Sequence, residues 1–305
     1  MKNIRIIVAV IGVLMITNAC DPDKIYKEEL YQHVISLSSS ANNNILQYTH
    51  ELGSEEFAYI VASCGGTGAV EQDVHISLAV DAEVLETYNW AMYENDKTKY
   101  AHLLPLSNYV MDHNHILIPK GEHSGWMSIR IKPNGLSPDT AYFLPLAIES
   151  TSAYELNPKK SHLLYRVLIK NQYAEQLTSG YNNYRMDGFI NTTPTTIQAK
   201  PIQPLAVNKV RMMAGNLGFS ASIPILEARA VILEMTGNSV QIKPYKEDGT
   251  LAVTQLDDDP LYPNTYQMVY EWDKKYKQFL LHYTFKAGSA SEVEVRERLR
   301  FEVID

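Results

Sequence analysis

The feature that most constrains the fold is a period-two alternation of apolar and polar residues, repeated in short segments along the chain. Between Val74 and Asp81, every even-numbered residue is aliphatic and every odd-numbered residue is polar or small. This pattern is typical of a β-strand with one buried face. Comparable segments, separated by Gly, Pro, Asn or Asp, lie at 45–50, 57–62, 116–118, 127–132, 142–148 and 163–169. Residues 34–171 are therefore predicted to form an all-β sandwich.

One segment interrupts this series with a different period. After Asp81, apolar residues recur at helical spacing from Val84 to Met92. Aspartate is a favoured N-cap residue because its side chain accepts a hydrogen bond from a free backbone N–H of the first turn. We therefore expect one short helix at 82–93.

A second β series begins after a polar stretch at 170–180, where we place the domain boundary. Tight connections at 236–238, 247–249 and 273–277 predict neighbouring antiparallel strands. A meander of about eight strands tends to close into an up-and-down barrel, which removes its edges. We expect such a barrel over residues 172–305. Its predicted strands lie at 181–189, 196–205, 209–214, 228–235, 240–244, 266–273, 278–285 and 293–304.

Two of these strands carry alternating faces that predict what the barrel encloses. In the last strand, inward positions are assigned to Val293, Val295, Leu299, Phe301 and Val303, with charged residues outward. In the strand at 266–273, the same argument assigns one core-filling face to Tyr266, Met268, Tyr270 and Trp272.

The N-terminus has the pattern of an export signal. Lys2 and Arg5 precede an aliphatic run at 6–16 that is too short for a permanent membrane span. Small or polar residues then lead to Cys20. This ending resembles the lipobox of bacterial lipoproteins, in which the cysteine is acylated, although Thr17 stands where leucine is usual.

The resemblance implies a signal peptide at 1–19 and a lipidated tether at 20–33, with the lipid on Cys20 holding the protein on a membrane. The alternative is an ordinary signal peptide with an incidental cysteine. Acidic residues in the tether resemble the surface-export signals of Bacteroidota lipoproteins, which implies the outer membrane and its extracellular side.

Charge and cysteine content exclude two further possibilities. The formal net charge is −8 and no basic cluster is present, so nucleic acid is not expected as a partner. Once Cys20 carries lipid, Cys64 is the only remaining thiol, so no intramolecular disulfide is expected. We predict that Cys64 is a small buried side chain.

Both halves of the chain resemble known modules. The first resembles the N-terminal immunoglobulin-like domain of lipoproteins from Bacteroidota glycan-utilisation loci, where it precedes endo-β-N-acetylglucosaminidase, laminin-G-like or other β modules. The segments that carry this resemblance are Leu78 to Asp81, Tyr88-Asn89, Leu104-Pro105 with Tyr109, Ile118 to Gly121, and Tyr142 to Leu146 with Ile148.

The second half resembles the lipocalin-like module that accompanies the first in these lipoproteins. Its matching segments are Tyr184 to Gly188, Val210 to Gly215, Val240 to Pro244, Phe279 to Phe285 and Glu294 to Arg300. The resemblance implies glycan capture at the cell surface beside an outer-membrane transporter complex, with no cofactor.

Two other classes of function compete with glycan binding. A glycoside hydrolase needs two carboxylates facing each other across a cleft, and no paired-acid signature of a hydrolase barrel is present. A structural or adhesive surface protein would use a free donor strand, whereas the C-terminal segment has the pattern of an integral strand. We therefore predict a non-catalytic protein, with hydrolase as the first alternative.

Sugar binding requires flat apolar rings with polar groups beside them. Tyr262 lies in a predicted loop, Trp272 ends a strand and Tyr276 lies in the following turn, so we expect these three to surround one mouth of the barrel. The acidic run from Asp257 through Asp258 to Asp259 is expected to accept hydrogen bonds from sugar hydroxyls.

Other motifs carry weaker hypotheses. The acidic run is also a candidate calcium site, with a solvated turn as the alternative. His113 and His115 lack a third ligand at a convincing spacing for zinc, and Gly65 to Gly68 lack the lysine of a phosphate-binding loop. No metal is therefore assigned. Thr140 lies in an Asp-Thr-Ala triplet that resembles Bacteroidota O-glycosylation sites.

Overall fold

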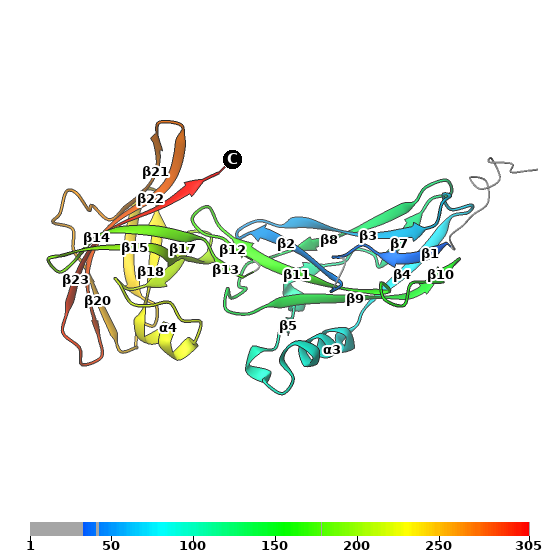
Figure 1. The fold of residues 1–305 in the computed structure, drawn as a ribbon, viewed down its shortest axis with the longest axis horizontal. Helices are drawn as coiled ribbons and strands as arrows, with labels where there is room; N and C mark the ends of the chain where they lie inside the picture. Colours follow the sequence, from blue (N-terminus) through cyan, green and yellow to red (C-terminus); the bar gives the residue numbers. More distant parts are fainter. Residues whose placement is uncertain (1–32, 41–42, 178, 305) are drawn as a thin grey trace, which may run out of the picture.

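The computed structural model describes residues 33–40, 43–177 and 179–304. Two β-rich parts lie end to end along an elongated molecule (Figure 1). Cys20 and the predicted tether lie outside the described residues. No helix of the described part is long and apolar enough to cross a membrane.

The N-terminal part contains two curled sheets that share one hydrophobic core. The first has the order β10-β1-β3-β8-β6, and the second has the order β2-β11-β9-β4-β7 with β5 beside β9. The strands of the first sheet are β1 (Val34–Leu37), β3 (Glu56–Gly65), β6 (Tyr109–Val110), β8 (Ser124–Ile131) and β10 (Glu155–Leu156). Those of the second are β2 (Ile45–Glu51), β4 (Val74–Val80), β5 (His102–Leu103), β7 (His115–Ile118), β9 (Tyr142–Thr151) and β11 (His162–Lys170).

The alternation along β4 (Val74–Val80) is confirmed for Val74, Ile76 and Leu78, which are fully buried, but it fails at the end of the strand, where Val80 is 45% exposed. Cys64 is also buried in this core, as expected. The immunoglobulin-like assignment is a finer statement than these two sheets establish, and it stays a prediction.

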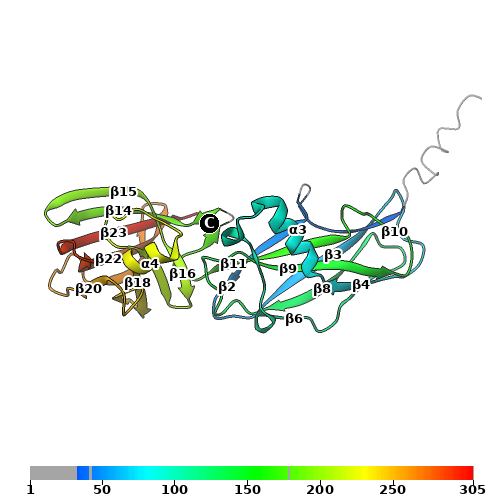
Figure 2. The ribbon, with the colours of Figure 1, turned by 90° about the horizontal axis from the view of Figure 1, so that it is seen from below.

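The helix expected at 82–93 is confirmed at both ends. Helix α3 (Ala82–Tyr93) begins after Asp81, whose Oδ1 accepts a hydrogen bond from Glu83 N at 3.0 Å. It packs on β9 and β11, where Leu85 meets Phe143. Figure 2 shows α3 lying across this sheet. Two short 3₁₀ helices follow, η1 (Lys97–Lys99) and η2 (Leu106–Asn108).

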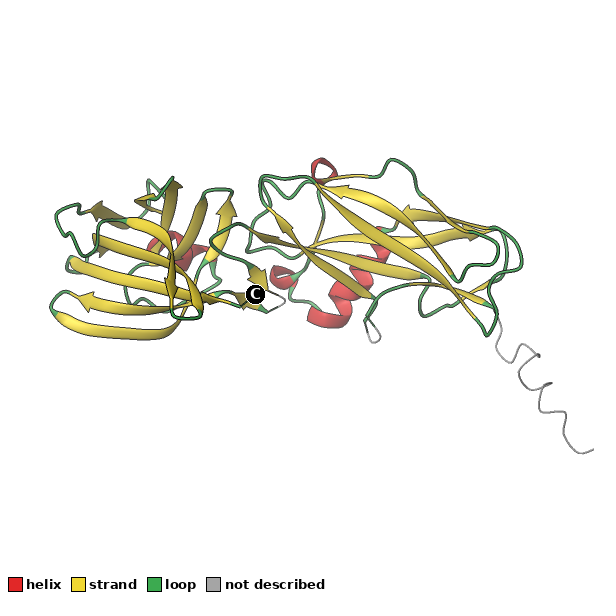
Figure 3. Ribbon diagram, turned by 90° about the horizontal axis from the view of Figure 1, so that it is seen from above, coloured by secondary structure: helices red, strands yellow, loops and turns green. Residues whose placement is uncertain are grey.

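The C-terminal part is one strongly curled antiparallel sheet with its own core. Its ladder runs β15-β14-β23-β22-β21-β19-β18-β17-β16, with β20 also paired to β22. The strands are β14 (Asn183–Ile190), β15 (Thr193–Pro201), β16 (Gln203–Ala206), β17 (Lys209–Met213), β18 (Ala230–Thr236), β19 (Ser239–Pro244), β20 (Leu251–Gln255), β21 (Thr265–Glu271), β22 (Lys274–Ala287) and β23 (Val293–Val303). The curl is visible in Figure 3. Within the described residues no ladder joins β15 to β16, so closure of the predicted lipocalin-like barrel stays a prediction.

Four details of the sequence prediction for this half are wrong. The turn expected at 273–277 lies at Trp272 and Asp273, so Tyr276 belongs to strand β22 and not to the turn. The segment expected as one strand at 196–205 is divided at Ile202 between β15, which pairs with β14, and β16, which pairs with β17. The connection at 247–249 does not join paired neighbours, since β20 pairs with β22 instead of β19. A short helix, α4 (Ile223–Arg229), and strand β20 were not expected.

The predicted core face of β21 also needs correction. Tyr266 is buried and Met268 packs against the core, but Tyr270 is 71% exposed and Trp272 is fully exposed. The reason is geometric, because the β21–β22 hairpin extends beyond the curled sheet and its tip has no core beneath it (Figure 1). Trp272 occupies the turn with a positive φ of 58°.

The two parts are joined by direct contacts as well as by the chain. The segment between them contains the small hairpin of β12 (Gln176–Leu177) and β13 (Gly180–Tyr181), and the predicted boundary at 171/172 falls at its start. Asp139 of the N-terminal part forms a 2.5 Å ion pair with Arg211 of the C-terminal part, and both side chains are buried. The hydroxyl of Tyr181 donates to Pro138 O at 2.6 Å.

Candidate functional site

The outward face of β14, β23 and β22 carries most of the candidate site. Inward residues of these strands, such as Tyr184 and Leu299, are fully buried, so their neighbours point to solvent. The ladder places Asp187 opposite Arg298 and Arg185 opposite Arg300. The sheet therefore brings together side chains that lie more than 100 positions apart in the chain.

Two neighbouring hollows open on this face. The arginine hollow, of about 580 Å³, is lined by Arg185, Arg298, Arg300 and the rings of Tyr276 and Phe301. The tyrosine hollow, of about 420 Å³, is lined by the apolar side chains Tyr262, Leu261, Phe189 and Leu280. Asp187 and Arg298 line both hollows and form the wall between them.

Ion pairs fix the side chains of the arginine hollow. Arg185 binds Asp187 with both ends of its fork, at 2.9 Å from Nε to Oδ2 and 3.0 Å from Nη2 to Oδ1. These hydrogen bonds lower the pKa of Asp187, with a further contribution from the Thr196 hydroxyl. The Arg300 guanidinium lies 4.2 Å from the centre of the Tyr276 ring, a cation–π contact that orients the ring.

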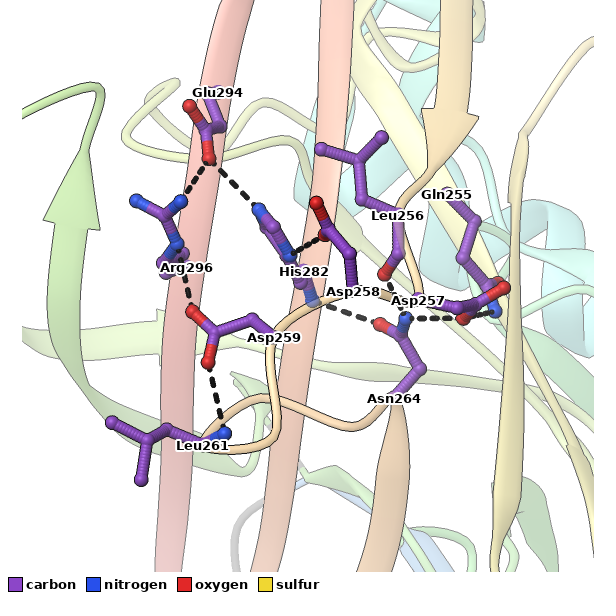
Figure 4. A network of polar contacts seen from close by, with 10 residues as sticks. All are labelled: Gln255, Leu256, Asp257, Asp258, Asp259, Leu261, Asn264, His282, Glu294 and Arg296. Carbon is purple, nitrogen blue, oxygen red and sulfur yellow. Dashed lines mark hydrogen bonds and ion pairs between the residues drawn. The ribbon is translucent and has the colours of Figure 1, made fainter.

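The acidic run forms the loop that supports the tyrosine hollow. Figure 4 shows its carboxylates bound to neighbouring side chains. Asp257 accepts hydrogen bonds from Gln255 and Asn264, which lower its pKa. Asp258 lies 3.2 Å from His282 Nδ1.

The third carboxylate of the run holds the loop against β23. Asp259 pairs with Arg296 at 2.9 Å and accepts from Leu261 N. Asn264 has a positive φ of 52° and donates to Leu256 O, which closes the loop. None of the three acids lines either hollow, so their observed contacts position Leu261 and Tyr262.

The predicted aromatic residues are only partly brought together. Tyr262 and Tyr276 line the two adjoining hollows on the outer face of the sheet, whereas all three aromatics were expected around a barrel mouth. Trp272 lies at the hairpin tip and lines neither hollow. Thr140 is half-buried beside Asp139, whose carboxylate is already engaged by Arg211.

No group of three or more metal-ligating side chains occurs within the described ranges. The His113 and His115 rings lie 4.6 Å apart, but they remain a pair.

The sequence prediction missed two groups of residues. The first is the set of arginines in the arginine hollow, because only the strand register shows that they converge. The second is an aromatic surface on the N-terminal part, formed by Phe57, Tyr59 and Trp126 on the outward face of β3 and β8. The Tyr59 and Trp126 rings meet edge to face at 5.3 Å. The sequence showed that these residues alternate with buried ones. It did not show that the outward face of β3 and β8 is left uncovered by the rest of the protein.

Comparison with known proteins identifies the architecture. One family model, described as an N-terminal domain, matches residues 25–155, and another, described as a C-terminal domain, matches residues 161–300. The chain is a two-domain protein. No curated protein matches its sequence.

Solved structures of similar fold come from Bacteroides. A Bacteroides ovatus protein of unknown function has 15% sequence identity and a TM-score of 0.63, and the match covers 92% of this chain and 93% of that one. An auxiliary nutrient binding protein from Bacteroides thetaiotaomicron has 15% identity and a TM-score of 0.59, with 89% and 95% covered. At these identities the likeness shows that the two-domain protein shares their fold.

Proposed function

We propose that this protein is a non-catalytic glycan-binding lipoprotein of the outer membrane, anchored through Cys20 with its domains on the extracellular side. In this proposal it captures oligosaccharide or polysaccharide for an outer-membrane transporter complex, and the N-terminal domain acts as a spacer. The nutrient-binding relative supports this proposal at the level of fold.

The observation that carries the proposal is the pair of hollows on the C-terminal sheet. Sugars bind where apolar ring surfaces adjoin fixed hydrogen-bonding groups. Tyr276 and Phe301 supply rings in the arginine hollow, and Tyr262 supplies one in the tyrosine hollow. On the shared wall, the Asp187 carboxylate is held by two hydrogen bonds from Arg185, so it presents acceptor oxygens in a fixed position beside the Arg298 guanidinium.

The proposed contacts assign roles to the predicted residues. A glycan chain lies along the two hollows and contacts Tyr262 and Tyr276, and Trp272 is reached only by a ligand that extends to the hairpin tip. Asp257 and Asp259 act through the loop that carries Tyr262. Thr140 remains a proposed O-glycosylation site.

The hydrolase alternative has a specific difficulty at this site. A glycosidase needs a general acid that holds its proton near neutral pH, usually through a raised pKa. Asp187 lines both hollows, and the hydrogen bonds from Arg185 lower its pKa. Release of reducing ends from a glycan panel, abolished by Asp187→Asn, would establish the hydrolase instead.

The pairing of the last strand, β23, argues against the alternative that the protein is a structural or adhesive surface protein. β23 is paired along its whole length with β22 on one side, and from Val295 to Arg300 with β14 on the other. A strand that completes its own sheet is not available for donation to another molecule. Polymerisation of the purified protein would contradict this reasoning.

The test is a glycan-array and affinity-gel screen of the mature chain carrying Cys20→Ala. With a binding glycan identified, Tyr276→Ala and Tyr262→Ala should each weaken binding by about fivefold or more, since a stacked ring contributes on the order of 1 kcal/mol. Trp90→Ala is the matched control, because Trp90 is an exposed tryptophan of helix α3 remote from both hollows. If only Trp126→Ala abolished binding, the site would be the aromatic surface of the N-terminal domain.

A further inference from the structure

The arginine hollow concentrates positive charge on an otherwise acidic chain. Arg185 and Arg300 face each other across paired strands, an arrangement of like charges that destabilises a sheet unless something compensates for it. Arg298 lies two residues from Arg300 on the same face of the same strand, and it completes a group of three guanidinium groups. The whole chain, by contrast, has a formal net charge of −8.

The carboxylates of the hollow compensate this charge incompletely. Asp187 and Glu302 are the acidic residues of its lining. Glu302 is bound by Lys274, which reaches it from the hairpin at 2.9 Å, and Glu271 reaches Arg300 at 2.6 Å. With Lys274 and Glu271 included, the hollow has four cationic side chains and only three carboxylates. The cations are Arg185, Arg298, Arg300 and Lys274, and the carboxylates are Asp187, Glu302 and Glu271.

Arg298 is the guanidinium best placed to take an external anion. Asp187 is already bound by both ends of the Arg185 fork. The ion pair of Arg298 with Asp187 is long, at 3.6 Å, and the Arg298 side chain is 44% exposed. It also lies in the wall between the hollows, where it faces a ligand in either of them.

We infer that the arginine hollow selects an acidic glycan, with Arg298 binding a carboxylate or sulfate group of a sugar whose ring lies against Tyr276. The forked guanidinium matches both planar carboxylate and sulfate oxygens, which a neutral sugar lacks. This inference rests on the proposed function, and it adds a ligand class to it.

The experiment compares each acidic glycan with its own neutral form at physiological salt. Polygalacturonate is paired with its methyl ester, and a sulfated glycosaminoglycan is paired with its desulfated form. We expect at least one acidic member to bind about tenfold more tightly than its neutral partner, with binding that weakens as salt is raised. The pair that shows the difference identifies carboxylate or sulfate as the recognised group.

Variants then locate the effect. Arg298→Gln should reduce binding of the acidic glycan about tenfold and leave its neutral form unaffected, while Arg298→Lys should restore part of it. Arg130→Gln is the control, because Arg130 is an ion-paired, partly exposed arginine of the N-terminal domain. Thermal melts of each variant verify folding.

Two results would overturn the inference. If acidic and neutral glycans bound equally and Tyr276→Ala weakened both, selection for charge would be wrong while the proposed function stood. If acidic binding survived Arg298→Gln unchanged, the anion site would lie elsewhere. Failure of every glycan to bind would instead refute the proposed function itself.

Discussion

A buried ion pair beneath the arginine face is expected to control the stability of the C-terminal domain. Glu297 lies on β23 between the outward residues Arg296 and Arg298, and it points into the core with no exposed surface. Lys200 Nζ lies 2.5 Å from its Oε2, and the Lys200 side chain is 4% exposed. The Tyr283 hydroxyl donates to Glu297 Oε1 at 2.9 Å.

Replacing Lys200 by Met removes the ammonium and leaves the Glu297 carboxylate buried with one remaining neutral donor. Loss of one partner from a buried pair costs about 3–5 kcal/mol, because the other charge stays desolvated without compensation. The double variant Lys200→Met with Glu297→Leu removes both charges, so it should be less destabilised than Lys200→Met alone.

The control is the exposed pair of Lys274 and Glu302, whose side chains are 49% and 41% exposed. Lys274→Met should lower the free energy of unfolding by less than about 1 kcal/mol, since solvent screens this pair. Urea unfolding is followed by circular dichroism, and amide hydrogen exchange in β22 and β23 assigns the transition to this domain. If Lys200→Met lowered the free energy of unfolding no more than Lys274→Met, the buried pair of Lys200 and Glu297 would contribute as little as an exposed pair, and the reasoning would be refuted.

Four shorter predictions concern other parts of the chain. Burial lowers the pKa of His50 below its ordinary value of 6.5, so the unfolded state binds more protons below that pH. Melting temperatures of the N-terminal domain should therefore fall as pH falls from about 6.5, and His50→Gln should flatten this dependence. Arg211→Met leaves Asp139 buried between the domains without its charged partner, so it should increase interdomain mobility measured by small-angle scattering. An unchanged scattering curve would show that this ion pair does not hold the two domains in place. Cys20→Ala should release the protein into the soluble fraction, whereas retention after carbonate washing would exclude the lipid anchor. Because Trp272 is fully exposed at the hairpin tip, Trp272→Ala should leave the melting temperature of the C-terminal domain unchanged within about 1 °C. A larger drop would show that the Trp272 ring packs against the domain.

Local signals allowed accurate prediction where the cause of structure is local. Helix α3 was predicted to the residue because the Asp81 cap and the apolar spacing after it lie within one short segment. Most strands were also predicted, since alternation is a property of consecutive residues. Helix α4 was missed because its seven residues are too few to show a helical period. Strand β20 was missed because only Leu251 and Val253 mark its inward face, although its burial does alternate.

Glu297 illustrates a limit of alternation. The inward positions of the last strand were assigned to apolar residues on either side of it, and Glu297 occupies the inward position between Val295 and Leu299. Nothing in the neighbouring sequence explains how the charge of Glu297 is compensated at a buried position. Its partner Lys200 lies 97 positions earlier in the chain, so only the folded sheet shows that the charge is paired.

The candidate site was hidden for the same reason. The outward direction of Arg296, Arg298 and Arg300 was predicted correctly, yet a row of outward arginines on one strand is also typical of an ordinary solvated face. What distinguishes this face is the register with β14, which sets Arg185 opposite Arg300 and gives Asp187 to Arg185 as its partner. That register depends on two strands separated by most of the domain. The inference of an acidic ligand therefore rests on a cross-strand arrangement that no single stretch of the sequence contains, and Arg298→Gln is the substitution that tests it most directly.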